Sequence, residues 1–352
     1  MFGKKINVLI VGSKGQLGSY LLDFFNKDSM MKKSKFGKIF GVDRDELDIC
    51  NKEAVSDFFN QYVYDPLVKF DYVINCAAAT DTAAIEKDPT SYYAVNVLGA
   101  KHLAETCFYN KIKLIHISTD YVFSEYSNNS SSINPEPFPV NQYGLQKLLA
   151  EKFIETAYSK WPKGYLISRS SWMFGNSRKS FVEKLLTNMA KEYARCTYDE
   201  RVDQSMSIDV VNDCFGRPTH VKFIADFIKD SILDKKHGIC DCQLDCKQIS
   251  RYDWAKMIVE LAYNSFEDGS IQKMMMKKVL ILSVDSKQFS GMKHPGKVSS
   301  LLGKGISNED SICMFKRWTA TYIEDNKDVL KKTIEDAYNE EMNRLKNNEA
   351  DQ

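Results

Sequence analysis

The sequence lacks the features that mark proteins which bind nucleic acids or span membranes. Its 352 residues carry 48 basic and 47 acidic side chains, so the formal net charge is +1. Such a balance produces no strong field toward a polyanion, which disfavours a nucleic acid as a partner. The chain also has no apolar run of about 18 residues, the length that a membrane-spanning helix needs. These absences favour a small molecule as the ligand.

Histidine and cysteine are present, but without the pattern of a metal site or a disulfide framework. The five histidines have no metal-ligand spacing, and the nine cysteines are an odd number scattered along the chain. Cys240, Cys242 and Cys246 do not fit the paired cysteines typical of structural zinc. We therefore expect no metal and reduced thiols. The chain begins with an apolar run and a glycine-rich turn, without a cleavage site, so we expect a cytoplasmic protein.

What the sequence does contain is an alternation of short apolar runs with amphipathic segments. The runs predict strands over residues 5–11, 38–42, 72–76, 113–117 and 164–168. The amphipathic segments predict helices over residues 16–25, 52–61, 92–110 and 142–160. This order is typical of a parallel sheet with helices on both faces. We predict an α/β fold with a Rossmann-type, doubly wound parallel sheet and a smaller C-terminal substrate lobe.

The alternation also predicts how the chain is divided. We expect residues 1–172 to form an NAD(P)-binding Rossmann domain and residues 173–323 to form mainly the substrate-binding lobe. Residues 213–235 are expected to return to the Rossmann core, and residues 324–352 to form a charged, solvated helical tail that frays. The polar segment 124–140, which contains prolines, predicts a lid or an insertion.

A glycine-rich turn lies between the first expected strand and the first expected helix. Gly12, Gly15 and Gly18 follow the spacing GxxGxxG. Glycine lets the backbone turn tightly and approach a pyrophosphate, and the next helix points its free N–H groups at the phosphates. Because the turn stands between a strand and a helix, it predicts a dinucleotide site rather than a plain turn.

Residues at the ends of the next two strands complete the expected cofactor site. Asp43 ends the second strand, where a carboxylate binds the adenosine ribose hydroxyls and favours NADH. Arg44 could pair with a 2′-phosphate, so NADPH stays open, and a strand-end cap is the alternative interpretation of Asp43. Cys76, Ala77 and Ala78 end the third run with small side chains, which let the chain lie against the nicotinamide ribose.

A tyrosine and a lysine four residues apart begin the fourth expected helix. Tyr143 and Lys147 share one helix face, and such pairs also occur by chance. A keto group reduced by hydride needs a proton on its developing alkoxide, and we expect the ammonium to lower the pKa of the phenol. Thr119 ends the fourth strand, at the sheet edge where doubly wound folds bind ligands. We predict Thr119, Tyr143 and Lys147 as the catalytic group.

Six stretches together resemble the extended short-chain dehydrogenase/reductases and, among them, the dTDP-4-dehydrorhamnose reductase family. They are Gly15–Gly18, Asn75–Thr80, Ser118–Phe123, Tyr143–Lys147 with Glu151, Arg169–Trp172 and Asp213–Thr219. The resemblance covers roughly residues 5–323. It implies reduction of the 4-keto group of a dTDP- or UDP-linked 4-keto-6-deoxy sugar by NADPH or NADH, giving an L-rhamnose-type product. A homodimer is left open.

The same resemblance implies roles for individual residues. Tyr143 would donate the proton, and Lys147 would hold the ribose. The cofactor would contact Gly12, Gly15, Gln16, Leu17, Gly18, Asp43, Arg44, Asp48, Ile49, Cys76, Ala77, Ala78, Thr80, Asn96, Tyr143 and Lys147. The sugar nucleotide would contact Ser118, Asp120, Tyr121, Trp172 and Lys297. For Lys297, which lies in a basic stretch, a solvated loop is the alternative interpretation.

Two other functions stay open. A combined 3,5-epimerase/4-reductase acting on a UDP-sugar needs an acid and a base on opposite ring faces, commonly a cysteine or histidine near the catalytic group. Residues 118–123 contain no cysteine, which weakens that hypothesis. A non-catalytic, NADP(H)-binding regulatory protein like the β subunit of methionine adenosyltransferase has the same fold. Oxidation of NADPH with and without keto sugar would separate an enzyme from a binding protein.

Overall fold

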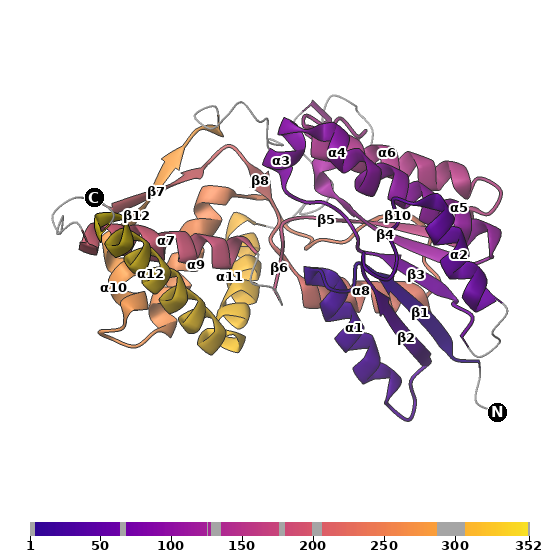
Figure 1. Cartoon of the computed structure of the whole chain (residues 1–352), viewed down its shortest axis with the longest axis horizontal. Coiled ribbons are helices and arrows are strands. Elements are labelled where there is room, and N and C mark those ends of the chain that lie inside the picture. The colour runs from indigo at the N-terminus through magenta and orange to yellow at the C-terminus, as the bar shows by residue number, and fades with distance from the viewer. Residues whose placement is uncertain are drawn as a thin grey trace. The chain divides into compact units, whose positions relative to one another are not determined.

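Two segments far apart in the sequence join in the first unit of the chain. The computed structural model describes residues 4–63, 68–124, 126–127, 135–175, 180–198, 206–286 and 307–350 (Figure 1). Unit 1 consists of Met1–Asn176 and Val221–Leu244, and unit 2 consists of Ser177–His220 and Asp245–Gln352.

Unit 1 is built around one parallel sheet with the strand order β10-β5-β4-β3-β1-β2. The strands are β1 (Ile6–Val11), β2 (Phe36–Val42), β3 (Tyr72–Asn75), β4 (Lys113–Thr119), β5 (Tyr165–Ser170) and β10 (Gly238–Asp241). The chain runs from β1 outward to β2 and returns to β3 on the other side of β1. This reversal is the switch point at which doubly wound sheets bind ligands, beyond the carboxyl ends of the strands. The predicted fold class is confirmed.

Helices cover both faces of this sheet. One face carries α2 (Lys52–Val63), α5 (Ala100–Tyr109) and α6 (Gln142–Ala157), and the other carries α1 (Gln16–Ser29) and α8 (Val221–Leu233) (Figure 1). Shorter elements of unit 1 are α3 (Thr82–Lys87), α4 (Pro89–Tyr93), a π-helical turn at Ala94–Gly99, 3-10 turns at Asp120–Val122 and Pro162–Gly164, and β6 (Met173–Phe174).

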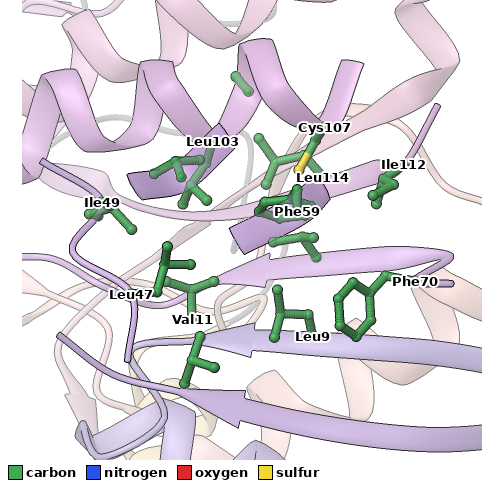
Figure 2. Close-up of a cluster of buried hydrophobic side chains, with 14 of the residues drawn as sticks. Leu9, Val11, Leu47, Ile49, Phe59, Phe70, Leu103, Cys107, Ile112 and Leu114 are labelled. Atoms are coloured by element: carbon green, nitrogen blue, oxygen red, sulfur yellow. The ribbon is translucent and has the colours of Figure 1, made fainter. Parts of the chain in front are cut away.

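The alternation of side chains along β1 explains why both faces are covered. Leu9 and Val11 pack with side chains of α2 and α5, such as Phe59 and Leu103, in the cluster shown in Figure 2. The neighbouring residues Val8 and Ile10 belong to the core beneath α1 and α8. A strand that is buried on both faces reads as a continuous apolar run, and this is the pattern that predicted the fold.

Unit 2 combines helices with two short strand pairs. Its elements are α7 (Phe181–Tyr198), β7 (Met206–Val211), β8 (Phe215–Gly216), β9 (Thr219–His220), β11 (Ile249–Ser250), α9 (Arg251–Ser265), α10 (Ile271–Lys278), β12 (Val279–Val284), α11 (Asn308–Asp325) and α12 (Lys327–Ala350). Strands β7 and β12 pair in parallel, and β8 and β11 pair in antiparallel. Ser250 caps α9, because its side chain accepts a hydrogen bond from the backbone N–H of Asp253.

The charged C-terminal segment differs from the expected solvated helix. Helix α12 buries Leu330, Ile334 and Ala337, and the Glu341 carboxylate accepts a hydrogen bond of 2.8 Å from Arg195 of α7. The apolar residues are three or four apart and therefore form one face of the helix. The high charge of the segment conceals this narrow stripe, so the sequence predicts the helix but not its packing.

Within the described part of the chain, every helix is too short or too polar to traverse a lipid bilayer.

Candidate active site

The glycine-rich turn after β1 is closed so tightly that no Cβ fits at Gly12 or Gly18. Gly12 has a φ of +80°, and a Cβ there would lie 2.7 Å from the backbone nitrogen of Ala77. A Cβ on Gly18 would lie 2.1 Å from the carbonyl oxygen of Gly12. The backbone N–H groups of Gly12 and Ser13 both donate to the carbonyl of Val42, which ties the turn to the end of β2. Glycine is required here by close backbone contact.

A carboxylate at the end of β2 holds the same turn from the other side. Asp43 accepts hydrogen bonds of 2.8 Å from the backbone N–H of Lys14 and 2.9 Å from that of Arg44. Gly15 is the N-cap of α1 and offers no side-chain acceptor to the first turn of the helix. The N–H groups and the dipole of α1 therefore remain directed at the pocket, an arrangement that suits an anion.

A pocket of about 660 Å³ lies beside this turn within unit 1. It is lined by nine of the residues expected at the cofactor, namely Gly12, Gly15, Asp43, Arg44, Asp48, Ile49, Cys76, Ala77 and Ala78. The lining of this pocket suits a dinucleotide. The N-terminus of a helix, glycines without a Cβ and other small residues all line the same cavity.

Other expected cofactor residues lie behind or beside the pocket. Leu17 is buried in the core with α8, and Thr80 is exposed. The side-chain amide of Gln16 donates to the carbonyl of Gly175 at 2.9 Å. Asn96 forms two hydrogen bonds with the backbone of Ala79, one to its N–H and one to its carbonyl. Asn96 thus fixes the segment that follows β3.

The start of α6 is anchored by several independent contacts. Asn141 caps the helix by accepting a hydrogen bond of 2.8 Å from the N–H of Gly144. A Cβ on Gly144 would lie 2.2 Å from the carbonyl oxygen of Tyr121, so only glycine allows this approach. Gln146 accepts from Asn96 at 2.9 Å and donates to the carbonyl of Pro89 at 2.7 Å. These contacts hold the first turn of α6, which carries Tyr143, against the end of β4.

Thr119 and Tyr143 meet at this edge. The Thr119 side chain lowers the pKa of the Tyr143 phenol, and the ring of Tyr143 packs edge-on against that of Tyr121, with centroids 5.8 Å apart. The Thr119 hydroxyl also accepts from the backbone N–H of Tyr121 at 3.2 Å. Two hydroxyl groups at the same edge can both bind one carbonyl oxygen.

The protonation of Tyr143 and Lys147 differs from the expectation. Burial is the main cause that raises the pKa of Tyr143 to about 12, and the nearby Asp120 raises it further. The Lys147 ammonium was expected to lower this pKa, but Nζ instead lies 2.9 Å from Nε2 of His116 and 2.7 Å from the carbonyl oxygen of Ile117. Burial lowers the pKa of Lys147 to about 8. The phenol is therefore a neutral acid at physiological pH. The lysine loses its proton at a pH close to the physiological one.

Of the expected substrate residues, Ser118 is held by a buried ion pair. Its hydroxyl donates to the Glu151 carboxylate at 2.5 Å. Glu151 also accepts from Arg169 at 3.0 and 2.6 Å, and both of these side chains are buried. Ser118 is thus turned toward Glu151 of α6, whereas the hydroxyl of its neighbour Thr119 accepts from the backbone N–H of Tyr121.

The remaining expected substrate residues follow the ends of β4 and β5. Asp120 and Tyr121 are buried in the 3-10 turn that Thr119 caps. Trp172 is buried with a φ of +40°, a backbone conformation that is strained for a bulky residue and common at functional sites. Lys297 lies outside the described residues.

Two buried polar residues beside Lys147 were not assigned to the site from the sequence. Asn75 and His116 pair across β3 and β4, and their side chains are 3.1 Å apart. The sequence does contain a signal for these two residues, because both are polar and lie inside otherwise apolar strands. That the two face each other and Lys147 follows only from the strand register and the position of α6. Among the described residues, no group of three or more histidine, cysteine or acidic side chains is placed to bind a metal.

Comparison with known proteins relates this chain to a family. The profile described as RmlD substrate binding domain matches residues 6–289. A dTDP-4-dehydrorhamnose reductase of Aggregatibacter actinomycetemcomitans is 31% identical over 63% of this chain and 65% of that protein. One of Mycolicibacterium smegmatis is 31% identical over 60% of this chain and 56% of that protein. The match thus spans less than two thirds of the length of these curated relatives.

Solved structures resemble more of the chain. A dTDP-4-dehydrorhamnose reductase of Bacillus anthracis in complex with NADP is 27% identical, with a TM-score of 0.63, over 83% of this chain and 88% of that one. An orthologue from Clostridium acetobutylicum is 27% identical, with a TM-score of 0.67, over 91% and 99%. A UDP-glucose 4-epimerase of Thermus thermophilus, 13% identical with a TM-score of 0.62 over 91% and 98%, shares the fold.

Proposed function

Because this chain belongs to the RmlD substrate binding domain family, we propose that it is an NAD(P)H-dependent reductase of a nucleotide-linked 4-keto-6-deoxy sugar. The reaction would be that of the related dTDP-4-dehydrorhamnose reductases and would give an L-rhamnose-type product. The observation that carries the proposal is the position of Tyr143, in the first turn of α6 against Tyr121, beside Thr119 at the carboxyl end of β4 and in the unit that contains the glycine-lined pocket.

The pocket beside α1 would hold the dinucleotide. The first turn of α1 and the glycines would receive the pyrophosphate, and Asp48 and Ile49 would lie beside the adenine. Asp43 already binds two backbone N–H groups, while Arg44 and Lys14 line the pocket as cations that suit a 2′-phosphate. NADPH and NADH therefore both remain candidates, in keeping with the NADP-bound relative. When bound, the cofactor supplies the hydride.

The side chains of the site would bind and protonate the keto oxygen. Thr119 and Tyr143 would donate to it, and as negative charge develops on the oxygen the phenol would transfer its proton. A phenol with a pKa of about 12 stays protonated at neutral pH, yet it is a stronger acid than the alcohol that forms. Positioning of these donors, together with stabilisation of the alkoxide, would supply the rate.

The sugar would contact residues near this edge. We assign Asp120, Tyr121 and Trp172 to the sugar, and Lys297 to the nucleotide phosphates. Ser118 would act through the Glu151 contact rather than directly. The homodimer stays a prediction, which sedimentation in solution would test. Since all nine cysteines are free, we also propose the cytoplasm, a reducing compartment, as the location.

The proposal is tested by following NADPH and NADH oxidation with dTDP- and UDP-linked 4-keto-6-deoxy sugars. We expect oxidation that depends on the keto sugar and yields the 6-deoxy-L-sugar nucleotide. Tight dinucleotide binding without turnover on any of these sugars would instead indicate a regulatory protein. Solvent deuterium incorporated at C3 and C5 of a substrate that has not been epimerised would reveal a combined epimerase/reductase.

Replacing Gly18 by alanine is expected to weaken dinucleotide binding about tenfold or more. The new Cβ would lie 2.1 Å from the Gly12 carbonyl and push the turn out of place. Overpacking of this kind costs about 1–3 kcal/mol, and 1.4 kcal/mol corresponds to a tenfold change in affinity. The measurement is titration of NADPH by fluorescence or calorimetry.

Gly37→Ala in β2 is the matched control for this variant. Its Cβ would meet the Asn7 side chain at 2.5 Å, away from the pocket. It should lower stability without changing the affinity for NADPH. Equal losses of affinity in both variants would argue against the turn as the phosphate site.

A further inference from the structure

Three buried polar side chains form a chain of contacts behind the catalytic edge. Asn75 ends β3, His116 lies opposite it in β4, and Lys147 reaches them from α6. The Asn75 side-chain nitrogen lies 3.1 Å from Nδ1 of His116, and Nε2 of His116 lies 2.9 Å from Nζ of Lys147. All three residues are at most 2% exposed. Each hydrogen-bond donor and acceptor of these three side chains therefore needs a partner within the protein.

The orientation of the Asn75 amide determines where the imidazole carries its proton. The Asn75 side-chain oxygen accepts a hydrogen bond of 3.0 Å from the backbone N–H of Ala77. Its NH₂ group consequently faces Nδ1 of His116, and Nδ1 must act as the acceptor. A neutral imidazole has one donor and one acceptor nitrogen. The proton of His116 is thus on Nε2.

This tautomer directs an N–H donor at the lysine. An ammonium group has three donors and no acceptor, whereas a neutral amine has one lone pair. The Nε2–H of His116 can therefore form a hydrogen bond with Lys147 only when Lys147 is neutral. The amine still donates to the carbonyl of Ile117 at 2.7 Å. The opposite tautomer, which an ammonium would need, sets the Nδ1–H against the NH₂ of Asn75.

We propose that Asn75 and His116 are positioning residues that favour the neutral amine of Lys147 by presenting a fixed Nε2–H donor to it. The consequence for turnover rests on the proposed reductase function, because Lys147 lies one helical turn from Tyr143. The tautomer itself does not depend on that function. Burial already lowers the pKa of Lys147 to about 8, and the Nε2–H donor of His116 acts in the same direction. Together they allow the lysine to exchange its proton near physiological pH.

Among the described residues, the other ionisable groups to consider around Lys147 are Cys76, Glu151 with its partner Arg169, and Tyr143. Cys76 follows β3, and burial raises the pKa of its thiol to about 12, so it is uncharged. Glu151, one turn further along α6, favours the ammonium, but its carboxylate is shared with Arg169 of β5 and Ser118 of β4. The Tyr143 phenol is neutral. None of these groups changes in a variant of Asn75.

Asn75→Asp is designed to reverse the tautomer. One carboxylate oxygen can accept from Ala77 and the other from an Nδ1–H, which leaves Nε2 as an acceptor for an ammonium. In the full chain without dinucleotide, ¹⁵N NMR of labelled histidine should show the proton on Nε2 in the wild type and on Nδ1 in the variant. The ¹³Cε shift of Lys147, assigned with Lys147→Met, should show a proton affinity about tenfold higher or more.

The new negative charge alone would also favour the ammonium, so a double-mutant cycle separates the two effects. In a His116→Phe background, Asn75→Asp retains its charge but has no tautomer to reverse, and its effect on Lys147 should be clearly smaller. In the enzymatic assay, the limb of the kcat/KM pH profile that Lys147 controls should move to higher pH in Asn75→Asp. A purely structural role would lower activity without moving the profile.

The proposal is overturned by a wild-type His116 that carries its proton on Nδ1, or by a Lys147 of ordinary proton affinity. Equal effects of Asn75→Asp with and without His116 would also overturn it. The NMR measurement on the wild type stands even if a variant does not fold. Because it needs no sugar substrate, a failed tautomer and a failed reductase function are distinguishable.

Discussion

Turnover of the Tyr143→Phe variant is expected to fall by about 10²–10⁴-fold, the usual contribution of a positioned general acid. The variant loses the only group that we assign to protonate the keto oxygen. It keeps the ring that packs against Tyr121 with centroids 5.8 Å apart, so the start of α6 should stay in place. The measurements are kcat at saturating NADPH and keto sugar, and the affinity for NADPH, which should be unchanged.

Tyr121→Phe is the matched control, because it removes a hydroxyl from the adjoining ring. We assign Tyr121 to sugar binding, so this change should act mainly on KM. A Tyr143→Phe enzyme with full turnover would remove the phenol from the mechanism. A loss of NADPH binding in the same variant would show that its effect is structural.

Removal of the buried carboxylate in Glu151→Ala should lower the free energy of unfolding by about 3–5 kcal/mol. The Arg169 guanidinium would then be left with a charge in the interior, where Glu151 now accepts two of its hydrogen bonds. The Ser118 hydroxyl would lose its acceptor as well. Urea denaturation followed by circular dichroism would measure the loss.

Glu155→Ala on the same helix is the control for charge removal. Glu155 pairs with Lys152 at 2.8 Å, but the two side chains are 31% and 60% exposed. An exposed pair of this kind contributes less than about 1 kcal/mol. If the two variants were equally stable, the buried pair would contribute no more than a surface pair.

Local patterns were sufficient for the fold class. The apolar runs that become β1, β3, β4 and β5 could be read directly, because strands of a parallel sheet are buried on both faces. The glycine spacing indicated the pocket, since the need for glycine is set by the backbone within a few residues. Thr119 and Tyr143 were named from their positions at the ends of elements, and in the structure Thr119 is near enough to Tyr143 to lower the pKa of its phenol.

What the sequence could not give depends on distant contacts. Glu151 was part of the family resemblance, but its pairing with Arg169 needs β5 beside β4 and α6 above them. The partner of Lys147 was expected to be Tyr143 because helix spacing is visible in a sequence. The contact of Lys147 with His116 could not be predicted, because the register of β3 with β4 is not visible in a sequence. Charge similarly concealed the buried face of α12.

The composition of unit 1 from two separated segments has a consequence for synthesis on the ribosome. When Asn176 has been made, the outer edge of β5 has no partner and the face of the sheet under α8 is uncovered. The missing helix and strand arrive only with Val221–Leu244, after part of unit 2 has been translated. A nascent chain therefore displays an open strand edge and apolar surface for an interval in which chaperones would act. For the same reason, a fragment ending near residue 176 should aggregate rather than bind cofactor.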